Sequence, residues 1–546
     1  MNKTIAHLKT YIRWTNHALT RVKLHLLVGT LFGIMKVVIG LTFIIQSKNM
    51  IDMATGTRDG SLWQGVAMLA LLIVAQLLLN VSNSYLYTQA ENLMKNNLRQ
   101  RLFGKLLISP LYGRGTYHSG DLTARLEEDV RIITSNITTS LPTVVITSTQ
   151  FVGAFVLLLQ FDRHLAWVIV FILPIFMVVG KLIGIRLRTM TKEIRKDESR
   201  IQSHIQEGLQ HSSLLRALEA ETLISTTLGN LQQGVYQKIL KRTRFTLCSR
   251  SVLSLGFTTG YLVAFVWGCF SLKQGTITFG IMTAFLQLVS QIQGPTAALA
   301  SLIPGFIHAS TSIDRLIEIE HFKSERPLQP VHLEQTPGIR FTNVDYSYPG
   351  EKQKLYNAFS YDFAPRTRTA VLGPTGTGKT TLIRMILALI EPEAGSITLY
   401  NGDKRVDVSP DTRCNISYVP QGNTLLSGTI EENLKLANPH ATPEAIRSAL
   451  HIAVADFVYS LPDGLQTRCG ERGAGLSEGQ AQRIAIARGL LKPSSVLLLD
   501  EISASLDKDT EALLFERLAE FAADKTIILI THRMNATTYC NQVLQL

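Results

Sequence analysis

The chain contains the stretch Gly373-Pro-Thr-Gly-Thr-Gly378-Lys379-Thr380, which fits the pattern G-x-x-x-x-G-K-[ST]. Apolar residues 369–372 precede it, and a helical pattern at residues 381–390 follows it. A strand, a glycine-rich turn and a helix in this order form a cradle whose backbone N–H groups bind phosphate. Lys379 would contact the β- and γ-phosphates of a nucleotide, and the Thr380 hydroxyl would bind magnesium. The alternative is a chance glycine-rich loop, which the flanking strand and helix disfavour.

A second apolar run, Val496-Leu-Leu-Leu, ends in two carboxylates, Asp500 and Glu501. Apolar strands that end in acidic residues are common, and this one by itself would indicate only a structural element. Its position downstream of the phosphate loop favours a functional interpretation. Asp500 suits the shell of a magnesium ion, and Glu501 suits the polarisation of an attacking water molecule.

Between these two elements lies Leu476-Ser-Glu-Gly-Gln480, a small polar loop that enters a predicted helix at Ser477. The loop offers a second helix N-terminus suited to an anion. With the three elements in this order, the chain resembles the ATP-binding cassette (ABC) transporters, whose LSGGQ signature is similar to residues 476–480. Glu478 stands where the family has the first glycine of the pair. A carboxylate here repels a nearby phosphate, but Ser477 and Gly479 are intact, and we expect the loop to tolerate it.

The resemblance extends to further cassette motifs. Tyr348 is similar to the aromatic residue that stacks on adenine, Gln421 to the Q-loop glutamine, and His532 to the switch histidine. Ser505-Leu506-Asp507 resembles the D-loop.

The resemblance therefore implies ATP and Mg²⁺ as cofactors and assigns residues to each role. The implied ATP-binding residues are Tyr348, Gly373, Pro374, Thr375, Gly376, Thr377, Gly378, Lys379, Thr380, Thr381 and Gln421. The implied magnesium ligands are Thr380, Gln421 and Asp500, and the implied catalytic residues are Glu501, His532 and Lys379. A second subunit would supply the signature residues Ser477, Gly479 and Gln480 in trans.

The composition separates the chain into two halves. The hydrophobic fraction is 46% and the charged fraction 18%, which excludes a disordered chain and disfavours a wholly soluble enzyme. Apolar runs long enough to span a bilayer lie at about 24–46, 62–87, 141–160, 164–182, 251–270 and 281–306. The five cysteines show no C-x-x-C spacing, which disfavours a disulfide scaffold and a zinc site.

These runs predict a multidomain chain. Its N-terminal part, residues 1–320, is an all-α transmembrane domain of six helices that resembles the exporter type of ABC membrane domain. A linker at 321–338 connects it to an α/β P-loop NTPase domain with a helical subdomain at 339–546. Residues 110–130 and 213–221 resemble the coupling regions of that membrane domain.

Lys and Arg set the predicted orientation in the membrane. They concentrate before residue 24 and within 88–140 and 183–246, and they are sparse in the other loops between spans. This asymmetry predicts a multi-pass protein of the inner or plasma membrane with both termini in the cytoplasm. The Lys and Arg residues that set the membrane orientation thus account for most of the net charge of +12. Membrane lipid is therefore an expected partner, and nucleic acid is not.

Polar residues within the spans leave two interpretations open, a substrate pathway or hydrogen bonds between helices. Lys36 lies near the middle of the first span, where a charge costs at least ~2.5 kcal/mol. It therefore has a functional role or a snorkelling side chain, or the span is placed wrongly. The stripe on the second span is Gln76, Asn80, Asn83, Ser84 and Tyr87, and that on the sixth is Thr283, Gln287, Ser290, Gln291 and Gly294.

The resemblance implies an ATP-hydrolysing transporter that works as a dimer of half-transporters. It would move an unidentified lipid, peptide, drug or other small molecule out of the cytoplasm or between leaflets. A homodimer is favoured because this chain supplies every motif, and a heterodimer stays open. The alternatives are an importer on the same membrane fold, for example for metal chelates, and a non-transporting ATP-gated membrane regulator. A soluble P-loop ATPase acting on nucleic acid is disfavoured by the six spans.

Overall fold

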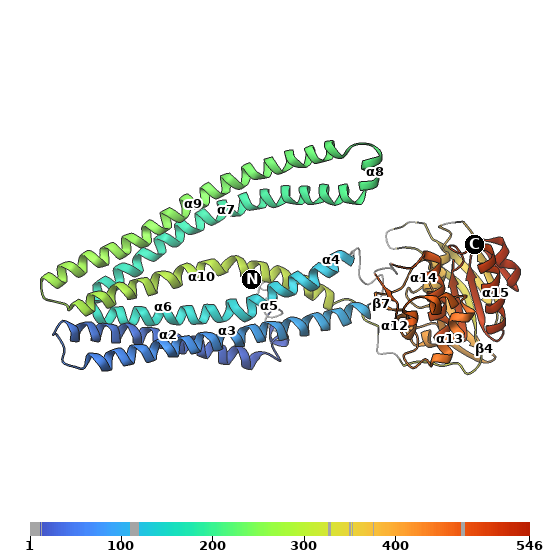
Figure 1. The fold of residues 1–546 in the computed structure, drawn as a ribbon, viewed down its shortest axis with the longest axis horizontal. Coiled ribbons are helices and arrows are strands. Elements are labelled where there is room, and N and C mark those ends of the chain that lie inside the picture. The colour runs from blue at the N-terminus through green and yellow to red at the C-terminus, as the bar shows by residue number, and fades with distance from the viewer. Residues whose placement is uncertain are drawn as a thin grey trace. The chain divides into compact units, whose positions relative to one another are not determined.

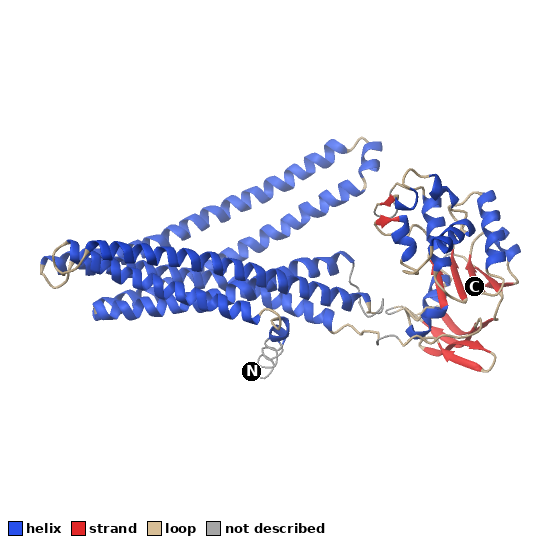
Figure 2. Ribbon diagram, turned by 60° about the horizontal axis from the view of Figure 1, so that its bottom comes forward, coloured by secondary structure: helices blue, strands red, loops and turns tan. Residues whose placement is uncertain are grey.

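The computed structural model describes residues 11, 14–109, 119–325, 329–348, 351, 353–374, 376–470 and 475–546 of the chain. It divides into two compact units, which are Met1–Gly104 with His118–Glu320, and Lys105–Tyr117 with His321–Leu546. The described part of the first unit is helical, whereas the second contains β-sheets covered by helices (Figures 1 and 2).

Long helices build the first unit. They are α2 (Lys23–Ala54), α3 (Leu62–Leu107), α7 (Arg163–Gln210), α9 (Glu221–Lys273) and α10 (Phe279–Glu320). A further helical path runs through α4 (Ser119–Ala124), η2 (Arg125–Asp129), α5 (Val130–Ser135), η3 (Asn136–Ser140) and α6 (Leu141–Phe161), with η2 and η3 as π-helical turns.

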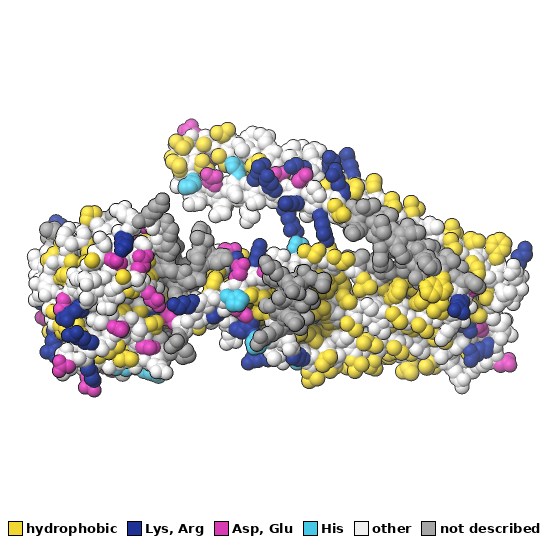
Figure 3. Space-filling model, turned by 180° about the vertical axis from the view of Figure 1, so that it is seen from behind, with side chains coloured by type: hydrophobic (Ala, Val, Ile, Leu, Met, Phe, Trp, Pro, Cys, Tyr) yellow, Lys and Arg dark blue, Asp and Glu magenta, His cyan; other side chains and the backbone are white. Residues whose placement is uncertain are grey.

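Several of these helices are suited to a membrane. Among the described residues, Lys23–Ala54, Leu62–Leu107, Gly120–Phe161 and Glu221–Lys273 are long and apolar enough to cross one. They contain the first, second, third and fifth predicted spans. The spans predicted at 164–182 and 281–306 fall in α7 and α10, where some side chains lie outside the described part, and they stay predictions. Hydrophobic side chains cover much of the visible face of this unit (Figure 3).

Helices α7 and α9 form a hairpin that leaves the other helices of the unit. The short helix α8 (Ser212–Ala217) joins them, and this end of the hairpin lies away from α6 and α10 in both ribbon views (Figures 1 and 2). Lys238 of α9 donates a hydrogen bond to Asp197 of α7 across the hairpin. The predicted coupling region at 213–221 falls at this turn, whereas residues 110–118 of the other one lie outside the described residues.

A buried carboxylate joins α2 to α10. Asp52 is only 4% exposed, accepts a hydrogen bond of 3.2 Å from the backbone N–H of Gly280, and lies 3.3 Å from Lys48. A Cβ atom on Gly280 would lie 2.4 Å from Asp52 Oδ1, so only glycine fits this approach. Far from this junction, Arg125 of η2 pairs at 2.8 Å with Glu318 near the end of α10.

The second unit contains a parallel sheet whose strand order is β11-β3-β10-β9-β6. Its strands are β3 (Arg368–Leu372), β6 (Ile416–Val419), β9 (Val496–Asp500), β10 (Thr526–Ile530) and β11 (Gln542–Gln545). The central strands β9 and β10 are short and fully buried, as strands covered on both faces are, whereas the edge strand β11 is partly exposed. The carboxyl ends of parallel strands lie at one edge, so the loops after β3, β6, β9 and β10 meet there.

An antiparallel sheet and several helices complete this unit. The sheet has the order β2-β1-β4-β5 and consists of β1 (Gly338–Tyr346), β2 (Tyr356–Phe363), β4 (Ala394–Asn401) and β5 (Lys404–Asp407). A two-stranded ribbon pairs β7 (Gly428–Thr429) with β8 (Arg468–Cys469). The helices are α11 (Lys379–Ile386), α12 (Ile430–Lys435), α13 (Pro443–Ile452), α14 (Glu478–Leu491) and α15 (Lys508–Phe521). Buried side chains of α12, α13 and α14 share one core and form the helical part of the unit.

Arg413 ties the segment before β1 to the helix that follows the phosphate loop. Its guanidinium forms a fork with Glu325, at 2.6 and 2.8 Å. It also donates to the carbonyl oxygens of Leu387 and Ala388, at 2.6 and 2.8 Å, where α11 ends. One planar side chain thus satisfies the end of α11 and fixes Glu325.

We expect Arg413→Lys to destabilise this unit, because an ammonium keeps the charge but cannot reproduce the fork. The loss should be about 1–3 kcal/mol, as is typical of charge-assisted hydrogen bonds. It should appear as a lower unfolding temperature of the purified full chain. Arg405→Lys, at an exposed position of β5, is the matched control and should leave the temperature unchanged. Equal temperatures for the two variants would show that the fork contributes nothing.

Candidate functional site

The loop between β3 and α11 has a backbone that requires glycine. Gly373, Gly376 and Gly378 have φ values of 156°, 93° and 102°, in the region that side chains disfavour. A Cβ atom on Gly378 would also lie 2.9 Å from the Tyr356 hydroxyl. Thr377 donates from Oγ1 to the carbonyl oxygen of Pro374 at 3.0 Å. The predicted site residue Thr375 lies outside the described residues.

Lys379 is buried within this loop, at the first position of α11. Its Nζ donates to the carbonyl oxygens of Gly373 and Pro374, at 2.6 and 2.9 Å. A phosphate is a stronger acceptor for an ammonium than a neutral carbonyl. The loop therefore holds Lys379 in place for a phosphate that would replace these contacts, and the neighbouring Thr380 is exposed.

Tyr348 lies beside the first turn of α11. Its hydroxyl is 2.7 Å from Thr381 Oγ1, and its ring centroid is 5.4 Å from that of Tyr346 in an edge-on arrangement. Tyr348 is therefore near the helix that follows the phosphate loop. Its stacking on adenine stays a prediction.

Glu501 is the residue around which three loops meet. It follows β9 with φ 48°, a left-handed conformation that costs a non-glycine residue about 1–3 kcal/mol. Its backbone N–H donates to Ile530 at the end of β10, at 3.0 Å. Gln421 Nε2 donates to one carboxylate oxygen at 2.6 Å, and His532 Nε2 lies 2.8 Å from the other. The loops after β6, β9 and β10 thus bring together three of the predicted site residues.

Asp500 ends β9 and is only 5% exposed. The Tyr418 hydroxyl donates to it at 3.4 Å. Burial, and then the charge of Glu501, raise the pKa of Asp500 above its usual value. Magnesium prefers carboxylate, hydroxyl and amide oxygens and commonly shares protein ligands with phosphates. The buried carboxylate, the exposed Thr380 hydroxyl and the amide oxygen of Gln421, whose nitrogen binds Glu501, fit such an ion chemically.

The signature loop forms the start of α14. Ser477 Oγ accepts from the backbone N–H of Gln480 at 3.2 Å, and Gln480 Oε1 accepts from the backbone N–H of Ser477 at 2.9 Å. This reciprocal capping box fixes the N-terminus of the helix. Glu478 is the first helical residue, and it is exposed.

The two adjacent positions that are glycine in the family signature, 478 and 479, differ in the room available for a side chain. A Cβ atom on Gly479 would lie 2.9 Å from the carbonyl oxygen of Ser505 in the D-loop, closer than real Cβ atoms come. Position 478 instead directs its side chain outward. This contrast explains how the chain accommodates Glu478, which the sequence could predict only as tolerated.

Sequence reasoning missed residues that support the site. Arg533, next to His532, donates to the carbonyl oxygen of Ala504, just before the D-loop, at 3.1 Å, and to that of Leu506 within it at 3.3 Å. It also pairs with Glu511 of α15 at 2.9 Å. The sequence signal that could have identified Arg533 was its position directly after the switch histidine. Tyr356 and Tyr418 carried no such signal, because aromatic residues in strands are usually core residues.

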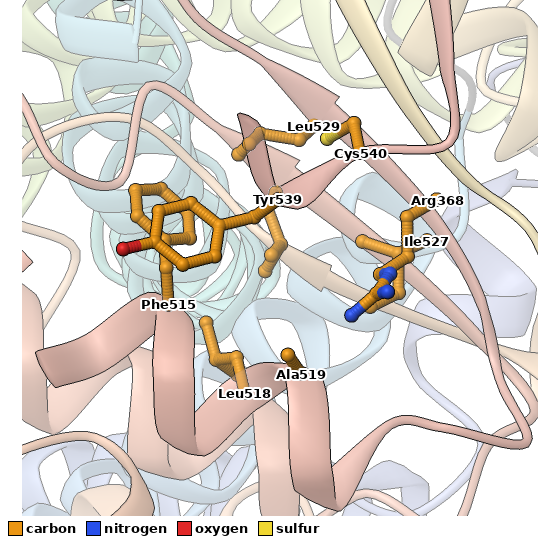
Figure 4. A pocket seen from close by; sticks show the side chains of 9 residues that line it. Arg368, Phe515, Leu518, Ala519, Ile527, Leu529, Tyr539 and Cys540 are labelled. Carbon is orange, nitrogen blue, oxygen red and sulfur yellow. The ribbon is translucent and has the colours of Figure 1, made fainter. Parts of the chain in front are cut away.

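A small apolar cavity of about 20 Å³ lies apart from these residues, between the sheet and α15 (Figure 4). Its lining includes Phe515, Leu518, Ile527 and Leu529, and burial raises the pKa of the Cys540 thiol to about 11. None of the predicted site residues lines it. An apolar lining of this kind offers little to a polar ligand.

Comparisons with known proteins identify the family. Residues 26–296 match the family model of the ABC transporter transmembrane region, and residues 356–504 match the family model described as ABC transporter. The chain belongs to the ABC transporters. It joins the membrane part and the cassette of such a transporter in one polypeptide, so the predicted family and fold class are confirmed.

Several similar proteins are named as ATP-binding/permease proteins. A probable multidrug resistance ABC transporter ATP-binding/permease protein of Bacillus subtilis is 29% identical, over 83% of this chain and 78% of its own. A putative multidrug export ATP-binding/permease protein of the same species is 25% identical, over 96% and 92%. The structure of a bacterial Atm1-family ABC exporter with ATP bound has the same fold, with a TM-score of 0.80, 20% identity, and coverage of 97% and 94%.

Family membership confirms ATPase activity coupled to transport as the activity class of this ABC transporter. ATP is accordingly its nucleotide. The roles of the individual site residues stay predictions.

The two glycine positions of the signature can be tested as a pair. We expect Gly479→Ala to lower ATP hydrolysis about 10- to 100-fold, because the added methyl group displaces the signature from the D-loop. Glu478→Gly removes a like charge without a clash and should hydrolyse ATP at least as fast as the parent. Both rates are measured on purified protein in lipid. Parental hydrolysis by Gly479→Ala, or its loss in Glu478→Gly, would contradict this account of the loop.

Proposed function

We propose that this ABC transporter is one half of an ATP-driven exporter. A dimer of such chains would move a lipid, peptide, drug or other small molecule out of the cytoplasm or between leaflets. The observation that carries the proposal is the contact of Gln421 and His532 with Glu501, at the same sheet edge as the loop that holds Lys379. The same chain has helices long and apolar enough to cross a membrane. The export direction is supported by the names of the relatives, of which one describes multidrug resistance and another multidrug export.

The nucleotide site would work through the contacts described above. Lys379 would exchange the carbonyls of Gly373 and Pro374 for the phosphates of ATP. Thr380, Gln421 and Asp500 would hold Mg²⁺, which when bound neutralises charge on the phosphates. Glu501 would orient the attacking water and take up its proton, while His532 and Gln421 hold the carboxylate at its two oxygens.

A second copy would complete each site. Ser477, Gly479 and Gln480 form a rigid capped helix start, suited to a phosphate bound on another subunit. This one chain contains the phosphate loop, the carboxylates, the signature and the histidine, so a homodimer is sufficient. The distribution of Lys and Arg supports a multi-pass protein of the inner or plasma membrane with both termini in the cytoplasm.

The proposal is tested with the purified chain alone in liposomes. We expect the parent to hydrolyse ATP without another protein, and Lys379→Ala to lose at least about 100-fold in rate, as when one positioned donor to a developing charge is removed. Lys404→Ala, at an exposed position of β5, is the control and should match the parent.

Two results would contradict the proposal. Parental hydrolysis by Lys379→Ala would remove Lys379 from the mechanism. Absence of hydrolysis in the parent would contradict the homodimer and favour a heterodimer with a missing partner. The direction is tested in inverted vesicles, where ATP added outside should drive accumulation of a labelled substrate, whereas an importer would expel it.

A further inference from the structure

We propose that Lys36 of α2 and Asn80 of α3 form an anion-binding site within the membrane unit. The transported molecule would then carry an acidic group on an apolar body. This inference rests on the proposed transport function and names its substrate class.

The positive charge of Lys36 is not neutralised by a carboxylate within the described part of the chain. Lys36 Nζ donates to Asn80 Oδ1 at 2.7 Å, and both residues are exposed. An ammonium has three N–H donors, and an amide is neutral, so this contact neither neutralises the lysine nor uses all its donors. Among the residues that the structure describes, no carboxylate pairs with Lys36.

The acidic residues of the neighbouring helices lie too far along their axes to reach it. On α2 the single acid is Asp52, sixteen residues from Lys36, or about 24 Å along the helix. Asp52 is already engaged by Lys48 and Gly280. On α3 the single acid is Glu91, eleven residues from Asn80, or about 16 Å.

The two further helices that pack on α2 give the same result. Helix α6 has no acidic residue. Helix α10 has three, all in its last seven residues, at positions 314, 318 and 320. These three acids have partners of their own, Tyr11, Arg125 and Arg101 respectively.

The position of Lys36 around α2 separates it from the face suited to lipid. The exposed apolar residues of this helix form one stripe, Leu24, Leu27, Leu31, Met35 and Val38. At 100° per residue, Lys36 lies about 140° around the axis from Leu31 at the centre of that stripe. It therefore lies toward the side of α2 that contacts α3.

The polar stripe of α3 brackets this site. A Cβ atom on Gly40 would lie 3.1 Å from Gln76 Nε2, and one on Gly29 would lie 3.1 Å from Asn83 Oδ1. Gln76 and Asn83 thus pack against α2, but among the described residues neither forms a hydrogen bond to that helix, so both interpretations of the stripe stay open for them. Asn80, between them, meets the lysine instead.

An anion bound here has donors of two kinds. Lys36 retains N–H groups, and within the part of the chain that the structure describes the Asn80 amide nitrogen, Nδ2, donates to no other residue. Beside Asn80, Leu77 and Val81 are 64% and 62% exposed and offer apolar contacts. A carboxylate, sulfate or phosphate on an apolar body matches this combination, whether it is a single-chain amphiphile or an anionic lipid.

The test compares two probes with the same acyl chain, one anionic and one neutral. Purified protein in phosphatidylcholine liposomes receives dodecanoate or its neutral methyl ester, and stimulated ATP hydrolysis is measured. The parent should respond to dodecanoate at a concentration at least about tenfold lower than Lys36→Gln does, while the ester acts alike on both. Asn80→Asp should lose the same response, because its carboxylate neutralises Lys36. Lys36→Arg should keep it.

Controls separate the local site from general effects. Lys23→Gln removes a charge from the start of the same helix and should behave as the parent. Phosphatidylglycerol added to the liposomes distinguishes the two sources of the anion. If lipid supplies it, basal hydrolysis rises in the parent and not in Lys36→Gln. If it has no such effect, a single-chain amphiphile is the source.

The outcomes bear separately on the two proposals. Equal responses of the parent and Lys36→Gln to dodecanoate, including no response in either, overturn the anion site when ATP is hydrolysed normally. A parent that hydrolyses no ATP under any condition contradicts the proposed function, and the site falls with it. A loss in Lys36→Gln that Asn80→Asp does not share would also overturn the pairing.

Discussion

Contacts from three loops fix the position of the Glu501 carboxylate, and the proposed chemistry of the nucleotide site requires that position. The Glu501 backbone is left-handed where β9 ends, which a glutamate adopts only when its surroundings enforce it. Ile530 accepts its N–H, while Gln421 and His532 contact its two carboxylate oxygens. Because these partners follow neighbouring strands of a parallel sheet, the geometry of the sheet sets the position of the carboxylate.

Close contacts also explain which departures from the family signature this cassette accepts. A glycine is required where another atom occupies the space that a side chain would need. Gly479 is such a position, because a Cβ atom there would meet the Ser505 carbonyl, whereas position 478 is exposed. In the membrane unit, Gly280 is fixed by the buried carboxylate of Asp52. Close backbone approaches therefore distinguish a required glycine from a replaceable one.

Much of the fold was predictable because its signals are local. The phosphate loop, the apolar strand ending at Asp500 and the signature each occupy a few consecutive residues. Contacts between distant segments were not predictable, such as the fork between Arg413 and Glu325 and the Arg533 contact with the D-loop. The polar stripe of the second span shows the same limit, since a sequence gives the face of a helix but not what packs against it.

The most direct measurement of the central claim uses Glu501→Gln. The amide is nearly isosteric and leaves Lys379 and Asp500 in place, but it cannot accept the proton of water. The variant should bind Mg-ATP as the parent does, retain it uncleaved, and hydrolyse it about 10²- to 10⁴-fold more slowly. Glu516→Gln, exposed on α15, should hydrolyse normally. Near-parental hydrolysis by Glu501→Gln would contradict the assignment of Glu501 as the catalytic carboxylate.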